Sequence, residues 1–195
     1  MNAEQIHDSL APRQGRLCPW QCVCHFDNFL RPLIHDPRKL FGPYVQCGMT
    51  VLDVGCGRGF VSLALARMVG EEGLVISADV QPEMLEMVRE RAMRAGLFHK
   101  IRTHRCEPSR IGVREALDFV VAFYMVHEVP ESRAFLKEVY ARLKPGGRFF
   151  IAEPKVHVSY NHFMHTVQEA QQVGFIVLET PHVRLSRAVV LTKEV

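Results

Sequence analysis

The most constraining feature of this chain is a short apolar run that ends in a cluster of glycines. Residues 50–54 read TVLDV, and residues 55–59 read GCGRG. A short run of this kind, rich in β-branched residues, is typical of a buried parallel strand. Glycines directly after such a strand permit a tight turn into a helix and bring a ligand close to the main chain. The segment therefore predicts an α/β fold that binds a ligand at the carboxyl end of this strand.

Strand and helix patterns alternate along the rest of the chain. We expect strands at 50–54, 74–80, 101–105, 117–123, 148–152, 175–179 and 183–192. We expect helices at 60–69, 82–96, 131–143 and 161–173. The last two strands are too close in sequence for a helical crossover and should be antiparallel. The predicted fold is a three-layer αβα sandwich, with a Rossmann-like, mostly parallel seven-stranded sheet and a C-terminal antiparallel hairpin.

The first 45 residues have a different character. Residues 1–17 are polar and aperiodic, and prolines divide residues 18–45 into short pieces with helical patterns. We therefore expect an N-terminal arm and helical cap over residues 1–45 and a ligand-binding domain over residues 46–195. In this interpretation Tyr44 is the part of the cap nearest the glycine loop, and the cap closes over the ligand.

Two aspartates accompany the glycine loop. Asp53 directly precedes it, and Asp79 ends the second predicted strand. The spacing is G-x-G-x-G, whereas the dinucleotide pattern G-x-G-x-x-G needs a glycine at Phe60. An aspartate beside the ligand suits an ammonium group better than a pyrophosphate, and a carboxylate at Asp79 can accept hydrogen bonds from ribose hydroxyls. The pattern favours a nucleoside ligand with an ammonium group; the alternative is a purely structural turn followed by a solvated acid.

Four segments in register resemble the successive motifs of class I S-adenosylmethionine-dependent methyltransferases. They are VLDVGCGRGF, ISADVQPEML, LDFVVAFYMVHEVP and LKPGGRFFIAEP, and the likeness covers about residues 45–195. The resemblance implies S-adenosylmethionine as the cofactor. It assigns the methionine part to the glycine loop, the ribose to the acid after the second strand and the adenine to residues after the second and third strands. The implied cofactor-binding residues are Asp53, Gly55, Cys56, Gly57, Gly59, Asp79, Val80, Glu107 and Phe123. Cys56 is expected to be a small packed residue of the loop, with no catalytic role.

The segment after the fourth predicted strand reads FYMVHEVP, residues 123–130. The resemblance places it beside the reactive end of the cofactor, with Tyr124 and His127 as candidate catalytic residues. A histidine can remove a proton from a thiol, hydroxyl or amine near neutral pH. The alternative for His127 is a structural histidine, and Glu128 is expected to orient the loop. The Asp/Asn-Pro-Pro-Tyr/Phe run common in amino-group methylases of nucleic acids is absent from this segment, which disfavours that activity.

Two clusters contain residue types that bind metals. The first comprises Cys18, Cys22, Cys24 and His25, and the second His157, His162 and His165. Neither has the paired spacing of a structural zinc site, so no metal is predicted. Both clusters remain candidates for lining a substrate pocket, and Glu153 and His157 are candidates for contact with the acceptor.

Composition limits the partners. The formal net charge is only +3, which gives little electrostatic reason to expect nucleic acid or a membrane surface. No apolar run reaches the roughly 18–20 residues needed to span a bilayer, so we expect a cytoplasmic protein with reduced cysteines. The predicted activity is methyl transfer to a small-molecule acceptor, with the accepting atom and the oligomeric state left open. The alternatives are a non-catalytic S-adenosylmethionine-binding module and a nicotinamide-dependent oxidoreductase.

Overall fold

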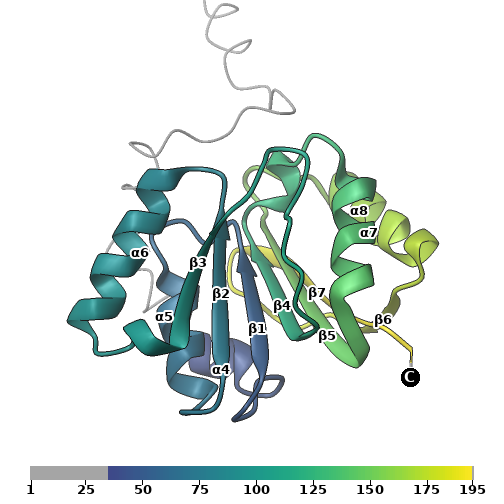
Figure 1. Ribbon diagram of the computed structural model, residues 1–195. Coiled ribbons are helices and arrows are strands. Elements are labelled where there is room, and N and C mark those ends of the chain that lie inside the picture. Colours follow the sequence, from purple (N-terminus) through teal and green to yellow (C-terminus); the bar gives the residue numbers. More distant parts are fainter. Residues whose placement is uncertain (1–34, 195) are drawn as a thin grey trace, which may run out of the picture.

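The computed structural model describes residues 35–194 and contains one seven-stranded sheet with helices on both faces (Figure 1). The strands are β1 (Thr50–Val54), β2 (Leu74–Asp79), β3 (Ile101–Arg105), β4 (Leu117–Phe123), β5 (Leu143–Pro154), β6 (Ile176–Glu179) and β7 (Ser186–Thr192). The helices are α4 (Pro37–Phe41), α5 (Phe60–Met68), α6 (Pro82–Arg94), α7 (Ser132–Arg142) and α8 (Tyr160–Val173), with short 3-10 turns η1 (Phe98–Lys100) and η2 (Val126–Glu128). The predicted fold class is confirmed.

The strand order is β3-β2-β1-β4-β5-β7-β6. Strands β1 to β5 pair in parallel, and β7 runs antiparallel to both of its neighbours, β5 and β6. The order reverses between β1 and β4, because the chain builds outward from β1 in one direction and from β4 in the other. In such a sheet the crevice at the carboxyl ends of the two central strands is the expected ligand site.

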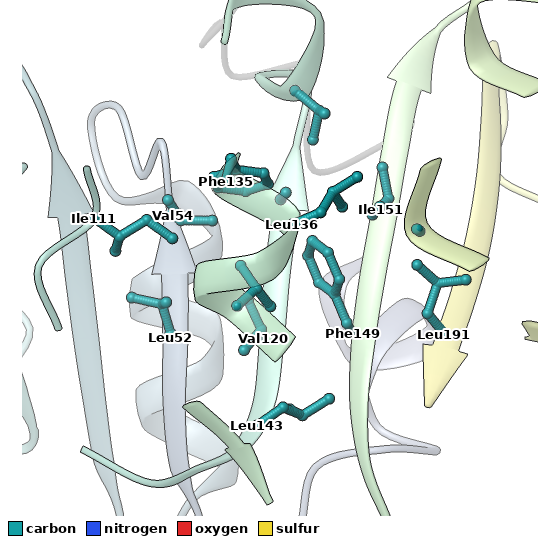
Figure 2. Packing of buried hydrophobic residues seen from close by; sticks show 14 of the residues in the cluster. Leu52, Val54, Ile111, Val120, Phe135, Leu136, Leu143, Phe149, Ile151 and Leu191 are labelled. Carbon is teal, nitrogen blue, oxygen red and sulfur yellow. The ribbon is translucent and has the colours of Figure 1, made fainter. Parts of the chain in front are cut away.

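Alternate side chains of the strands point to opposite faces of the sheet, and each face has its own core. Leu52, Val120, Phe149 and Ile151 belong to the core on the α7 side, where Leu136 of α7 packs on them (Figure 2). Val51, Phe119 and Phe150 belong to the core under α4, α5 and α6. Because both faces of the central strands are buried, their sequences must be almost continuously apolar. The sequence of β4, LDFVVAF, has this pattern.

One predicted boundary was wrong. The sequence KPGG at 144–147 was expected to end the helix before the fifth strand, with that strand at 148–152. The structure ends α7 at Arg142 and begins β5 at Leu143, which pairs with Leu117 before a register irregularity near Phe119. The two glycines of this segment are accommodated as an irregular strand because pairing to β4 continues on both sides of them.

The described part of the predicted cap packs on the sheet. Phe41 of α4 is fully buried, and its ring contacts those of Phe119, Phe123 and Phe150. Residues 1–34, including the cluster of Cys18, Cys22, Cys24 and His25, lie outside the described residues. No helix among residues 35–194 is long and apolar enough to cross a membrane.

Candidate functional site

The glycine loop joins β1 to α5 with three residues in the left-handed region. The φ angles are +69° at Gly55, +50° at Gly57 and +79° at Gly59, which caps α5 without any side-chain hydrogen bond. At Gly55 a Cβ atom would lie only 2.7 Å from the Met125 side chain. Glycine is thus required twice over at this position, by the backbone conformation and by the close approach of the loop after β4.

Asp53 is buried at the carboxyl end of β1 on the face that carries α5. Its Oδ2 accepts a hydrogen bond of 2.5 Å from Ser62 Oγ, and Ser77 Oγ donates in turn to Ser62 Oγ at 2.8 Å. Asp53 and Ser77 are register partners in β1 and β2, so strand pairing places both beside the first turn of α5. The carboxylate is oriented by this polar chain, and Asp53 also lines the cavity described below.

Asp79 ties the glycine loop to the end of β2. Its Oδ2 accepts a hydrogen bond of 2.9 Å from the Gly57 amide, and its Oδ1 accepts one of 2.9 Å from the Gln81 amide. Desolvation by burial raises the pKa of this carboxyl above its ordinary value, and the main-chain hydrogen bonds oppose that rise. Each carboxylate oxygen can accept a further hydrogen bond. Asp79 can therefore hold the loop and bind ligand hydroxyls at the same time.

A third wall comes from the loop after β3. Glu107 and Arg110 exchange main-chain hydrogen bonds, and the Glu107 side chain is exposed at the rim. The loop is fixed from α7, where Glu138 accepts hydrogen bonds from the amides of Ile111 and Gly112 at 2.8 and 2.7 Å. Glu138 was not singled out from the sequence. It lies 26 residues from Gly112 on a helix that reads as an ordinary amphipathic one, so no local signal identifies it.

These walls enclose a cavity of about 410 Å³ at the carboxyl ends of β1, β2 and β4. That volume is within the range of small-molecule sites. The structure brings nearly all of the predicted binding residues to it; the cavity is lined by Asp53, Gly55, Cys56, Gly57, Asp79, Val80, Glu107, Phe123, Tyr124 and His127. Gly59 is not part of this lining and acts as the cap of α5 instead.

His127 is held by a carboxylate from the neighbouring strand. Its Nδ1 lies 2.6 Å from Oε2 of Glu153, and its main-chain amide lies 3.2 Å from Oε1 of the same residue. Its Nε2 is 3.9 Å from Oε1 of Glu128. Burial acts to lower the His127 pKa, but the hydrogen bond and charge of Glu153, with the charge of Glu128, outweigh it and raise the pKa above its usual value. The imidazole is thus held in a fixed orientation at the cavity wall.

Tyr124 is one of two described non-glycine residues with a positive φ, +67°. Its hydroxyl lies 2.5 Å from Ser186 Oγ and 3.2 Å from His35 Nε2. The Phe123 ring packs against the Tyr124 and His35 rings. Tyr124 and Phe123 both line the cavity, but the Tyr124 hydroxyl is engaged by groups of β7 and of the segment before α4. The structure thus gives Tyr124 a fixed place in the wall, and a catalytic role for it stays a prediction.

Cys56 and Cys106 are buried thiols of the cavity wall. Burial, with the nearby charges of Asp53 and Asp79, raises the pKa of Cys56 well above its ordinary value. Burial raises the pKa of Cys106 to about 12. Both are therefore protonated at neutral pH and unsuited to nucleophilic chemistry, in line with the packing role expected for Cys56.

The three C-terminal histidines are not brought together. His157 lines the cavity, whereas His165 lies on the exposed side of α8 with its Nδ1 3.8 Å from Glu169. Across residues 35–194 no three His, Cys, Asp or Glu side chains are grouped so that they would hold a metal ion.

The expectation for Tyr44 was wrong. Its ring stacks on that of Phe119 at 6.1 Å, and its hydroxyl donates to Glu179 at 2.9 Å. Phe119 is paired with Val51 at the first half of β1, away from the carboxyl ends of the strands, and Tyr44 is not part of the cavity lining. Tyr44 is close to the glycine loop in sequence but not in space, because Tyr44 precedes β1 and the loop follows the opposite end of that strand.

Comparison with known proteins agrees with this site. A family model described as a methyltransferase domain matches residues 51–147, which span β1 to β4, α7 and the start of β5. A crystal structure of a SAM-dependent methyltransferase from Aquifex aeolicus superposes with a TM-score of 0.81 at 26% identity, over 90% of this chain and 98% of that one. The chain belongs to the class I S-adenosylmethionine-dependent methyltransferases.

Two relatives of this methyltransferase show what else the family contains. A ubiquinone biosynthesis O-methyltransferase of Methylobacterium sp. is 33% identical over 118 residues, which are 60% of this chain and 46% of that protein. The ubiquinone/menaquinone biosynthesis C-methyltransferase UbiE of Escherichia fergusonii is 32% identical over 110 residues, 56% of this chain and 44% of that protein. The regions of this chain that match the two relatives cover less than half of the length of each relative.

The residues of this methyltransferase cavity fit S-adenosylmethionine. Gly55 and Gly57 of the glycine loop line the cavity, and the carboxylates of Asp53 and Asp79 provide acceptors for an ammonium group and for hydroxyls. Val80 is half-buried and packs against the apolar core, where it offers a surface for a flat ring. These acceptors and this apolar surface are thus complementary to a nucleoside joined to an amino acid.

Proposed function

We propose that this protein transfers the methyl group of S-adenosylmethionine to a hydroxyl group of a small aromatic acceptor, with His127 as the general base. The observation that carries the proposal is the hydrogen bond of 2.6 Å between His127 Nδ1 and Glu153 Oε2 at the cavity wall. A carboxylate only accepts hydrogen bonds, so Nδ1 carries the proton and the lone pair of Nε2 is available. A general base in this state removes the acceptor proton as the new bond to carbon forms.

Cofactor binding falls to the loops after β1, β2 and β3. When bound, S-adenosylmethionine supplies an electrophilic methyl group on a sulfonium, and loss of that group leaves the neutral thioether S-adenosylhomocysteine. Asp79 would accept hydrogen bonds from the ribose hydroxyls, and Val80 would pack on the adenine. Glu138 stabilises this arrangement through the amides of Ile111 and Gly112, because it fixes the loop that forms the far wall.

Glu153 orients the base and tunes it. It is only 2% exposed and projects from β5 toward the α7 side of the sheet, where η2 presents His127. Its negative charge stabilises the imidazolium that forms when Nε2 takes the proton. Glu128 adds a second negative charge 3.9 Å from Nε2. The same charges raise the His127 pKa and so make the imidazole a stronger base.

The proposed acceptor follows from the lining around the base. Met125, Val129, Pro130 and Pro154 line the cavity next to His127 and Glu153 and present apolar surface. Apolar walls beside a few polar groups, here the imidazole of His127 and the carboxylate of Glu128, are suited to an aromatic ring that bears a hydroxyl. The two curated relatives are named for ubiquinone biosynthesis, and one of them is an O-methyltransferase. A phenol or catechol of small size is therefore the acceptor class that we favour.

The direct test is a transfer assay on the full chain with methyl-labelled S-adenosylmethionine and a panel of phenols, catechols, thiols and amines. Formation of labelled methyl ether with at least one phenol or catechol is expected. His127→Ala should reduce the rate by about 10²–10⁴-fold, the usual contribution of a general base, without weakening cofactor binding. His165→Ala is the matched control, since this exposed histidine lies outside the cavity.

Each other outcome points elsewhere. Labelled thiol or amine products with no ether would overturn the acceptor class but not the cofactor. Calorimetric binding of S-adenosylmethionine without transfer to any acceptor would favour a non-catalytic binding module. Equal rates for the His127→Ala and His165→Ala variants would remove His127 from the chemistry.

A further inference from the structure

The glycine loop contains a guanidinium group, that of Arg58, whose Nε atom has no partner among residues 35–194. Arg58 lies between Gly57 and Gly59 and lines the cavity. Its Nε atom is buried and has no hydrogen-bond acceptor within the part of the chain that the structure describes. A buried N–H group of a guanidinium that lacks an acceptor is costly, and native structures retain few such groups without a functional reason.

The loop backbone holds Arg58 in place. The Arg58 carbonyl oxygen accepts a hydrogen bond of 2.6 Å from Nη1 of Arg91 on α6. Gly57 and Gly59 on either side adopt positive φ angles, and the Gly57 amide is bound to Asp79. The main chain at residue 58 is thus anchored on both sides and from α6, so the side chain starts from a fixed position.

The two aspartates that flank the cavity already accept hydrogen bonds from the protein. Asp53 accepts from Ser62 Oγ, and Asp79 accepts from two main-chain amides. Arg58 and Asp53, which directly precedes the glycine loop, both line the cavity. A cation and an anion on one short loop are complementary to a zwitterion, an ammonium group with a carboxylate.

We propose that Arg58 binds the carboxylate of the amino-acid part of the cofactor through its Nε and one Nη atom, while Asp53 faces the ammonium group. This inference rests on the proposed cofactor. A guanidinium offers two parallel N–H donors to a carboxylate, which a lysine ammonium cannot reproduce. Arg58 is thus a specificity residue: it makes the site select nucleosides that carry an intact amino acid over those that lack the carboxylate.

The test is a calorimetric titration of the full chain with two nucleosides. S-adenosylhomocysteine carries the carboxylate, and 5′-methylthioadenosine has the same adenosine and thioether without the amino acid. Arg58→Met keeps the length and apolar stem of the side chain but removes its charge. We expect Arg58→Met to weaken S-adenosylhomocysteine binding by about tenfold or more and to change methylthioadenosine binding by less than about twofold.

Two further variants separate geometry from charge. Arg58→Lys keeps the charge without the paired donors. Its affinity for S-adenosylhomocysteine should lie between those of wild type and Arg58→Met. Arg67→Met removes a positive charge from α5, where Arg67 Nη1 binds the Leu63 carbonyl oxygen outside the cavity, and should leave both affinities unchanged. Circular dichroism melting of each variant shows whether the fold is retained.

The outcomes are distinct. If Arg58→Met weakens binding of both nucleosides by the same factor, Arg58 only supports the loop and the inference is overturned. A wild-type affinity for methylthioadenosine equal to that for S-adenosylhomocysteine would also contradict it. If wild type binds neither nucleoside, the proposed cofactor itself is wrong, which is a different failure from loss of the Arg58 effect.

Discussion

His127 Nδ1 and Glu153 Oε2 lie 2.6 Å apart, although 26 residues separate them in the chain. The relationship depends on the pairing of β4 with β5, because His127 follows β4 and Glu153 is near the end of β5. Strand alternation sends Glu153 to the same face as Phe149 and Ile151, where η2 crosses toward α7. A carboxylate in this position favours the tautomer with a proton on Nδ1 and acts to raise the pKa of the histidine.

The first prediction concerns the pH dependence of methyl transfer. Because Glu153 and Glu128 raise the His127 pKa, the rate should increase with pH along a limb centred above 6.5, the ordinary histidine value, and then level off. Glu153→Gln keeps a hydrogen-bond acceptor for Nδ1 but removes the charge, so the limb should move to lower pH. Rate–pH profiles of both proteins measure this, and identical profiles would show that Glu153 does not set the pKa.

The same pair links pH to stability. A raised pKa means that the folded protein binds this proton more tightly than the unfolded chain does. The stabilisation by the charged pair is therefore complete below the unfolded pKa and is lost as the pH rises through the raised folded value. Melting temperatures of wild type and Glu153→Gln should converge at alkaline pH, and a constant difference between them would argue against the linkage.

The second prediction concerns Asp79. Asp79→Asn replaces one acceptor oxygen by a donor that faces a main-chain amide, and it removes the charge offered to the ribose. The affinity for S-adenosylhomocysteine should fall by about tenfold or more. Asp118→Asn is the matched control, since Asp118 binds the Thr50 amide and Lys144 at the opposite ends of the strands. Equal losses of affinity in the two variants would remove Asp79 from the ligand site.

The third prediction separates backbone strain from steric clash at the glycine loop. Gly55→Ala places a Cβ 2.7 Å from Met125 at a φ of +69°, whereas Gly96→Ala at +68° meets nothing within 4 Å. The left-handed conformation should lower the free energy of unfolding of each alanine variant by about 1–2 kcal/mol, and the steric clash should lower that of Gly55→Ala further. Chemical denaturation gives both values. If the two variants are equally destabilised, Met125 yields to the new atom at no measurable cost.

The fourth prediction concerns the loop after β3. Glu138→Ala removes the acceptors of the Ile111 and Gly112 amides, and each amide left unsatisfied costs about 1–3 kcal/mol. Amide hydrogen exchange at these two residues should accelerate, and cofactor affinity should fall with the loss of the ordered wall. Glu86→Ala is the control, because the exposed pair of Glu86 with Arg89 on α6 contributes little. Unchanged exchange at both amides would show that Glu138 does not hold the loop after β3.

The succession of strands and helices along the chain, the antiparallel C-terminal pair and the glycine loop with Asp79 could all be predicted from the sequence. These features depend on local rules: the period of apolar residues, the conformational freedom of glycine and the few residues between the last strands. The start of β5 at Leu143 could not be predicted by these rules. Leu143 pairs with Leu117, although the segment that follows it has local signals that favour a turn.

The hydrogen-bond partners within the site could not be predicted, because they come from distant parts of the chain. Glu153 reaches His127, Glu138 reaches the Ile111 amide, and the Tyr124 hydroxyl reaches Ser186, each across at least 26 residues. Tyr44, close in sequence to the glycine loop, stacks on Phe119 instead. Such contacts follow from the order and register of the strands, which no local pattern encodes. Local sequence thus predicts the glycine loop, whereas the pairing of the strands determines which side chains from distant loops are in contact.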